Sequence, residues 1–123
     1  MADVESVMVA GLAQATGVVV STEAPAQVSG PYIQVRAAGG VGRHDLVLDG
    51  RNVTLSVCHD SAPEAARLAD VTVAAIDNLA GTTVGNVFIT DASCSAPAWF
   101  PNEDGKPRYV MNAQLLIHET TTT

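Results

Sequence analysis

The spacing of the apolar residues changes once, near residue 60, and this change constrains the fold more than any other feature of the sequence. Val53, Leu55 and Val57 alternate with polar residues, a period of two that places one apolar row on one face of a β-strand. After residue 61 the apolar residues recur at the spacing of an α-helix. A half-buried strand leading into an amphipathic helix is therefore predicted. The helix is expected to bury Leu68, Val71 or Thr72, Ala75 or Ile76, and Leu79.

The residues that bound this helix carry signals of their own. Ser61 and Glu64 have the spacing of a capping box, in which the Ser61 hydroxyl accepts from the amide of Glu64 and the Glu64 carboxylate accepts from the amide of Ser61. Pro63 suits the first turn, where its missing N–H is not needed. Gly81 is a stop signal. The helix is thus predicted to start after Ser61 and to end before Gly81.

The whole pattern predicts one α+β domain over residues 1–123: an antiparallel or mixed β-sheet with two helices packed on one face and a long protruding β-hairpin. A first helix over residues 3–15, capped by Asp3 and ended by Gly17, carries an apolar stripe that includes Ala15. Residues 82–84 are expected to be a turn, and residues 119–123 a frayed tail. Further strands are predicted over residues 18–21, at an edge, and over 31–37, 85–94 and 108–118.

Strict alternation also assigns faces within the strand over residues 85–94. Val87 and Ile89 are expected on one face. Phe88, Thr90 and Ala92 are expected on the other.

The connection over residues 37–51 is the hairpin that we expect to protrude. It begins with glycines at positions 39, 40 and 42 and ends with the turn signal Asp49-Gly50. Long connections in compact domains are usually functional or disordered, and the alternative here is a solvated hairpin tip. Basic side chains gather in the hairpin or at its base. The candidate assembly contacts in this region are Arg36, Arg43, His44 and Arg51.

Trp99 and Phe100 are two further candidate contacts. They lie in a loop over residues 95–107 that contains three prolines and a turn at Asp104-Gly105. An aromatic pair on a loop either covers the core of its own domain or forms a docking surface. We favour the first, a lid over the core.

The charge and composition exclude some classes of partner. The chain carries 13 acids and 6 bases, a formal net charge of −7, which argues against tight binding around nucleic acid. It is 47% hydrophobic but only 15% charged, which suggests that partners cover part of its apolar surface. A plain soluble domain rich in Ala and Val is the alternative. The sequence shows no signal peptide or transmembrane span, and we expect a chain that is cytosolic when made.

The reactive side chains form no recognisable catalytic or metal-binding motif. Cys58 and His59 are neighbours on a strand, so their side chains are expected to point to opposite faces. Cys94 adds no short-spacing pair and no fourth metal ligand. We therefore predict no enzyme activity, no catalytic residues, no cofactor and no metal site. The alternative is a small cytosolic enzyme or ligand-binding α+β domain that uses Cys58, His59 or the glycine-rich loop 39–42.

Seven short segments occur in a specific order and spacing along residues 3–118. They are PYIQVR (31–36), GG (39–40), RHDLV (43–47), VTLSV (53–57), DSAPEAARLA (60–69), LAG (79–81) and NEDGKPRYV (102–110). Together they resemble the tail terminator, or tail-completion, proteins of phages with long non-contractile tails.

This resemblance implies a structural virion protein that forms a hexameric ring, caps the tail tube, ends its growth and joins the tail to the head. The implied partners are other copies of the chain, the tail-tube protein and the head–tail connector protein. DNA would pass through the lumen without sequence-specific binding, and no membrane is implied. The implied location is the head–tail junction of the virion, and the host cytoplasm before assembly. Another head–tail connector or a tail-tube ring subunit is the alternative.

Overall fold

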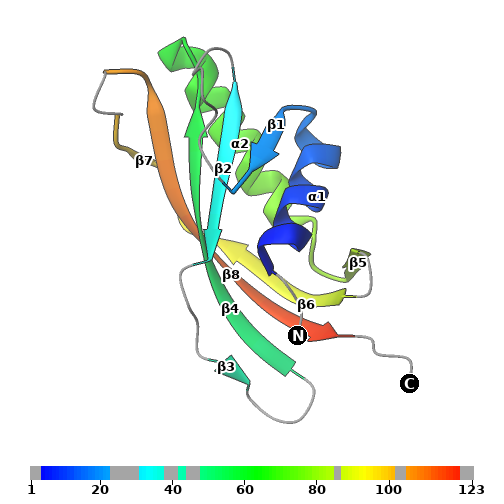
Figure 1. Ribbon diagram of the computed structural model, residues 1–123. Helices are drawn as coiled ribbons and strands as arrows, with labels where there is room; N and C mark the ends of the chain where they lie inside the picture. The colour runs from blue at the N-terminus through cyan, green and yellow to red at the C-terminus, as the bar shows by residue number, and fades with distance from the viewer. Residues whose placement is uncertain are drawn as a thin grey trace.

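Two long antiparallel strands, β4 (Leu48–Cys58) and β8 (Arg108–Glu119), run through the centre of the sheet. They pair in continuous register from Leu48 opposite His118 to Cys58 opposite Arg108. The computed structural model describes residues 4–22, 31–37, 42–43, 48–84, 87–101 and 105–119. These residues form an eight-stranded sheet and two helices (Figure 1), which confirms the predicted α+β fold.

Shorter strands extend the sheet on both sides of the central pair. On one side, β2 (Tyr32–Ala37) pairs with β4, and β1 (Val19–Ser21) runs parallel to β2 at the predicted edge. On the other side, β6 (Val87–Cys94) pairs with β8, and β5 (Thr82–Val84) forms the second edge. The sheet is therefore mixed. Off this path, β3 (Gly42–Arg43) pairs with β4, and β7 (Ala98–Trp99) pairs with β8.

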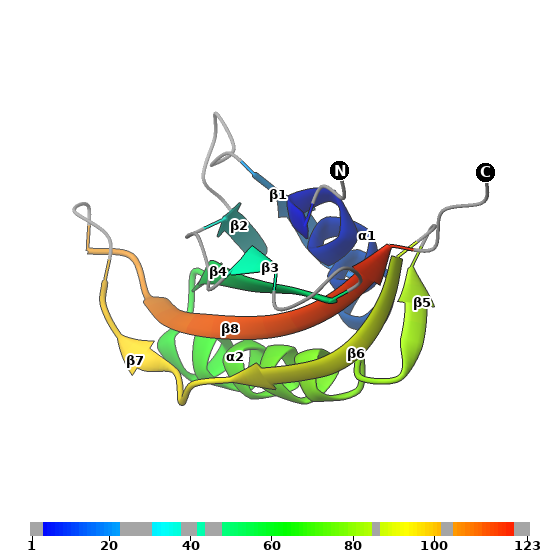
Figure 2. The same cartoon turned by 90° about the horizontal axis from the view of Figure 1, so that it is seen from below.

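Helices α1 (Val4–Thr16) and α2 (Ala62–Asp77) contact each other and pack on the same face of the sheet (Figure 1, Figure 2). The core lies between helices and sheet, and alternate residues of the central strands face it, as the period of two predicts. Neither helix, over its described residues, is long and apolar enough to cross a membrane. The central strands bury Val53, Leu55, Val57, Met111, Ala113, Leu115 and Ile117.

A glycine allows α1 to pack closely against the segment that follows α2. A Cβ atom added at Gly11 of α1 would lie 3.2 Å from Cδ2 of Leu79, just beyond the end of α2.

The structure shows which of the predicted helix residues are buried. Within α2, Thr72 is buried and Val71 is 44% exposed, so Thr72 is the one of these two alternatives that faces the core. The Thr72 hydroxyl is satisfied because it donates to the carbonyl of Leu68 at 2.7 Å. In α1, Ala15 is exposed, so the buried stripe ends one turn earlier than predicted.

Helix α2 starts where the sequence predicts, but the predicted capping box is wrong. Ser61 is the N-cap residue, and its carbonyl accepts from the amide of Ala65 at 2.8 Å, yet its side chain makes no capping hydrogen bond. The amide of Ser61 donates to Nδ1 of His59 at 3.3 Å. Glu64 instead pairs with Arg67 at 2.6 Å. The imidazole has therefore taken the place that the Glu64 carboxylate has in a capping box.

A β-bulge in β6 explains the face that strict alternation assigns wrongly. Ile89 and Asp91 stand opposite consecutive residues of β8, so Thr90 between them is an extra residue in the strand. The extra residue shifts the alternation by one position. Ala92 is therefore buried on the core face, which corrects the prediction that it faces away.

Three predicted connections contain strands. Residues 48–51 belong to β4, residues 82–84 form β5, and residues 98–99 form β7. Because β2 ends opposite Val53, β4 continues past it and pairs with both β3 and β8. The second strand of the predicted hairpin is thus part of the sheet. Glu119, expected in the frayed tail 119–123, is instead the last residue of β8 and stands opposite Val87. The rest of the hairpin (residues 38–41 and 44–47), the cap Asp3 and the remaining tail 120–123 lie outside the described residues.

Deleting Thr90 tests the bulge. Without this residue Ile89 and Ala92 both face the core in a regular strand, so we expect the free energy of unfolding to stay within about 1 kcal/mol of the parent value. The matched control is deletion of Asn112, an exposed residue of β8. This deletion reverses the faces of the residues that follow, and each buried side chain that turns to solvent lowers the free energy of unfolding by about 1.5–3 kcal/mol. Urea unfolding followed by circular dichroism measures both variants. Equal losses would contradict the bulge.

Candidate assembly surface

The face of the sheet without helices carries a row of uncharged polar side chains. These residues alternate with the core residues of β2, β4 and β8, so the pleat directs them away from the helices. Thr54 Oγ1 donates to Oδ1 of Asn112 at 3.0 Å, between the two central strands. Asn112 also exchanges two hydrogen bonds, of 2.8 and 2.9 Å, with Ser95. This face therefore offers donors and acceptors without net charge. The row is Gln34, Asn52, Thr54, Ser56, Asn112 and Gln114.

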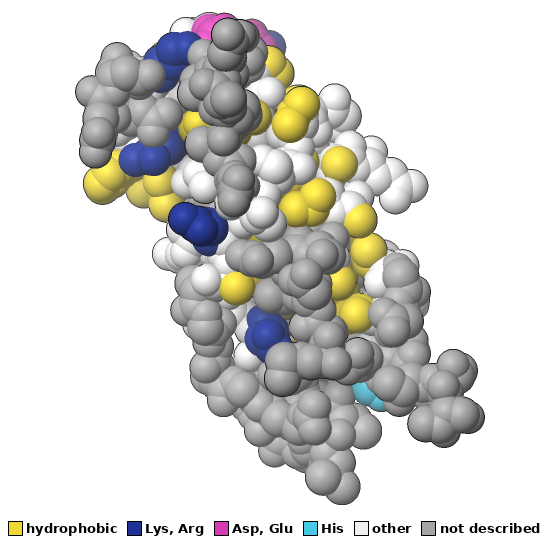
Figure 3. Space-filling model, in the orientation of Figure 1, with side chains coloured by type: hydrophobic (Ala, Val, Ile, Leu, Met, Phe, Trp, Pro, Cys, Tyr) yellow, Lys and Arg dark blue, Asp and Glu magenta, His cyan; other side chains and the backbone are white. Residues whose placement is uncertain are grey.

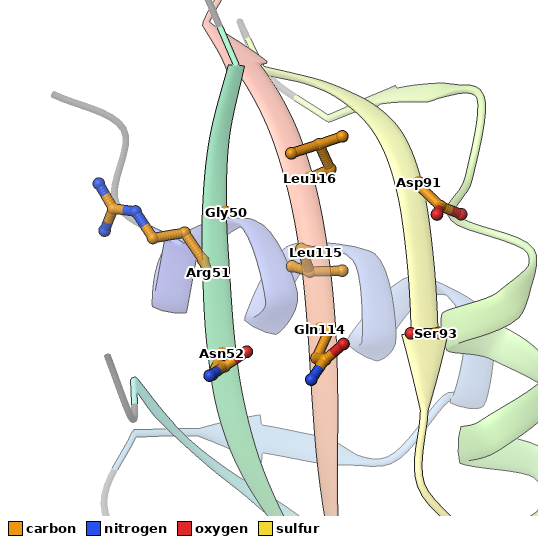
Figure 4. A pocket seen from close by; sticks show the side chains of 8 residues that line it. All are labelled: Gly50, Arg51, Asn52, Asp91, Ser93, Gln114, Leu115 and Leu116. Atoms are coloured by element: carbon orange, nitrogen blue, oxygen red, sulfur yellow. The ribbon is translucent and has the colours of Figure 1, made fainter. Parts of the chain in front are cut away.

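A hollow of about 200 Å³ lies on this face across β4, β8 and β6. Asn52, Gln114 and Ser93 lie side by side in it, while Arg51 extends away from them (Figure 4). Asp91 Oδ1 accepts from the amide of Ala92 at 3.0 Å, beside the bulge. Among the described residues, no His or carboxylate hydrogen-bonds to Ser93, the hydroxyl in the lining. The hollow offers amide, hydroxyl and carboxylate groups for hydrogen bonding, but its lining includes no nucleophile activated by a base.

The structure places two of the four predicted basic contacts, Arg36 and Arg51, on opposite faces of the sheet. Arg36 is exposed and stands opposite Thr54, on the helix-free face. Arg51 is half-buried and stands opposite Leu115, in register with the core side. The backbone of Arg43 lies in β3. Its side chain and the whole of His44 lie outside the described residues.

Trp99 and Phe100 lie at the opposite end of the sheet from β3. Trp99 is in β7, and Phe100 follows it. They are 51% and 61% exposed, so the expectation of a lid over the core was wrong. The Trp99 ring packs edge-on against Tyr109 at 5.3 Å between centroids, and the Arg108 guanidinium lies 5.4 Å from the centre of the Phe100 ring. Two further hydrogen bonds join residues 100 and 108: Phe100 N to Arg108 O at 2.9 Å and Arg108 Nε to Phe100 O at 2.8 Å. We call Trp99, Phe100, Arg108 and Tyr109 the aromatic platform.

A groove of about 220 Å³ lies between the first half of α2 and the starts of β1 and β2. Its walls are mainly apolar, with a charged pair at the rim, where Glu64 and Arg67 form the 2.6 Å ion pair. Val71 at its edge and Val19 in β1 are exposed, at 44% and 61%. We call this the α2 groove. It is lined by Thr16, Val18, Pro31, His59, Glu64, Arg67, Leu68 and Val71.

The sequence did not predict the groove or the place of Arg108 in the platform. Arg108 follows Pro107 at the start of a strand, and only the pairing of β7 with β8 brings it beside Phe100. The groove joins residues 16–18, 31 and 59–71, which are distant in sequence. One available signal was the β-branched run Val18-Val19-Val20, of which only Val20 is buried.

The two cysteines are free and far apart in the sheet. Cys58 ends β4 opposite Arg108, whereas Cys94 ends β6 opposite Ala113. In the described part of the chain, no three His, Cys, Asp or Glu side chains come together to hold a metal ion. His59 uses its amide to bond Pro107 O at 3.3 Å and its Nδ1 to accept from Ser61. These side chains therefore have structural roles at the start of α2 and in the core.

Comparison with known proteins gives a likeness of fold. No protein-family model and no curated protein matches the chain. Among solved structures, the chain is similar to one from the "Virion of native gene transfer agent (GTA) particle", with a TM-score of 0.68 over 93% of each chain. The two sequences are 14% identical, so the likeness shows a shared fold along nearly the whole of both chains.

The thiol of Cys94 gives a testable reactivity. Burial, and secondarily the Asp77 carboxylate, raise the pKa of this thiol from 9.0 to about 11. At pH 8 the shift lowers the thiolate fraction about 100-fold, while the more basic thiolate regains about tenfold in nucleophilicity. We expect iodoacetamide to alkylate Cys94 about tenfold more slowly in the folded chain than in urea. Peptide mass spectrometry measures both rates, and equal rates would contradict the burial.

The same shift has a defined effect on stability. Because the pKa of Cys94 is raised in the folded chain, this thiol stabilises the folded state. Its contribution to the free energy of unfolding is complete below pH 9 and is lost as the pH rises toward about 11. A Cys94→Ser variant should lose this component of the pH dependence.

Proposed function

We propose that the chain is a structural virion protein: a tail terminator whose ring caps the tail tube, ends its growth and joins the tail to the head connector. The observation that carries the proposal is the likeness of fold to a chain of a gene transfer agent virion over 93% of both chains. The order and spacing of the segments along residues 3–118 resemble tail terminators and support this particular ring.

The surfaces of the chain favour a role in assembly over a role in catalysis. The exposed aromatic platform and the apolar α2 groove offer contact area to other proteins. The helix-free face carries the row of uncharged side chains together with Arg36 and Asp91, whose charges balance, and no nucleophile held by a base lies in its hollow among the described residues. In a chain of net charge −7, such a face suits contact with passing DNA that is not held. The proposed function therefore includes no catalysis and no cofactor.

Electron microscopy of the purified chain with tail tubes tests this function. We expect one cap on one end of each tube, and tubes that no longer elongate when tube protein is added. A Trp99→Ala/Phe100→Ala variant should cap poorly, since it removes the exposed rings without opening the core. The matched control is Thr83→Ala, an exposed residue of edge strand β5. If the wild-type chain ignores tubes and binds the head connector alone, it is another connector and the tail-terminator proposal is wrong.

A further inference from the structure

We infer that two copies of the chain join head to tail, with Phe100 of one copy inserted in the α2 groove of the next. This inference rests on the proposed ring and names the surfaces that would build it. Both surfaces are exposed in the single chain, and neither packs against the other within it.

The aromatic platform is prepared for such a contact. The backbone of Phe100 is fixed by the two hydrogen bonds with Arg108, and its ring is stacked with the guanidinium at 5.4 Å. A side chain already held in place loses little conformational freedom on binding. Exposed rings held rigidly next to an arginine have the composition of a binding hot spot.

The α2 groove has the size and lining for one ring. Its volume of about 220 Å³ exceeds the roughly 150 Å³ that accommodates a benzene molecule, and it is smaller than the roughly 300–1,000 Å³ typical of small-molecule sites. Val18, Leu68 and Val71 supply apolar contact. A single aromatic side chain therefore suits this groove better than a metabolite does.

The sheet places the two surfaces at the same level on opposite sides. In the register, Val19 stands opposite Tyr32, Tyr32 opposite Cys58, and Cys58 opposite Arg108. Three strand spacings, about 14 Å, thus separate β1 beside the groove from β8 in the platform. Figure 1 shows β7 and β1 on either side of the upper half of the sheet. A contact between two different surfaces is heterologous. Such contacts close into a ring when the rotation that relates neighbouring copies brings the last copy back to the first.

Charge indicates another copy of this chain as the occupant. The Arg108 guanidinium lies over the Phe100 ring, whereas Lys106 pairs with Asp60 at 3.6 Å. Figure 3 shows Lys and Arg side chains beside apolar ones in the region of β7. Nε of Arg108 donates to Phe100, and no described residue accepts from its Nη groups. At the groove rim the partly exposed Glu64 carboxylate pairs with Arg67 through Oε1, which leaves its second oxygen for the Arg108 guanidinium of another copy, and the chain as a whole is acidic. The platform therefore complements the surface of a second copy.

Cysteine cross-linking tests the contact directly. In a Cys94→Ser background, Pro101→Cys, at an exposed position next to the retained Phe100 ring, and Val71→Cys in one chain should give a ladder of dimers, trimers and larger species with a short bismaleimide reagent. A mixture of the two single variants should stop at dimers, and Pro101→Cys alone should give none. The matched control pairs Pro101→Cys with Thr83→Cys. Absence of the ladder up to millimolar concentration, or equal cross-linking of Pro101→Cys alone, overturns the proposal.

Sedimentation velocity gives an independent measurement. We expect Phe100→Ala and Val71→Glu each to weaken self-association about 30-fold, the loss typical of a hot-spot residue, with Thr83→Ala unchanged. Unchanged association in both variants overturns the contact. If the wild-type chain caps tubes but the chain with both introduced cysteines shows no ladder on them, the proposed function stands and this contact is wrong. If the ladder forms and no tube is capped, the contact stands and the proposed function is wrong.

Discussion

The antiparallel pairing of β4 with β8 is the interaction on which the rest of the structure depends. Eleven consecutive residue pairs join these strands without interruption. Both strands place branched or long apolar side chains on one face and amides and hydroxyls on the other. This shared alternation produces one face that must be covered by α1 and α2 and one that remains helix-free. The buried core and the polar hollow on the helix-free face are thus two consequences of one ladder.

The two ends of this ladder carry the features that support assembly. At one end, β4 extends beyond β2 and pairs with β3, which carries Arg43. At the other, the start of β8 pairs with β7 and orders Trp99 and Phe100 on the surface. The turn from β4 into α2 lies at this same end, where His59 bonds to both Pro107 and Ser61. The aromatic platform and the α2 groove are therefore held in a defined relation by the strand register.

Local patterns in the sequence predicted the helices and most strands. The features that these patterns did not predict depend on pairing between residues that are distant in the sequence. The period of Val53 to Val57, the start of α2 after Ser61 and the αL glycine that ends α1 were predictable because each depends on neighbouring residues. The bulge at Thr90 was not, since only the register of β8 reveals an extra residue in β6. The capping box failed because His59 competes for the Ser61 amide. Trp99 was expected over the core, but pairing of β7 with β8 keeps it at the surface. The groove combines three segments that are distant in the sequence, so local patterns do not define it, and the β-branched run over residues 18–20 was one signal of exposed apolar surface there.

The proposed function makes this chain a structural component of a virion. Quantitative mass spectrometry of purified particles, released by the cells that make the chain, can detect it there. We expect the chain to co-purify with particles through a density gradient, in a small fixed number of copies per particle that corresponds to one ring. A chain that stays in the soluble fraction while complete, tailed particles sediment without it would contradict this function.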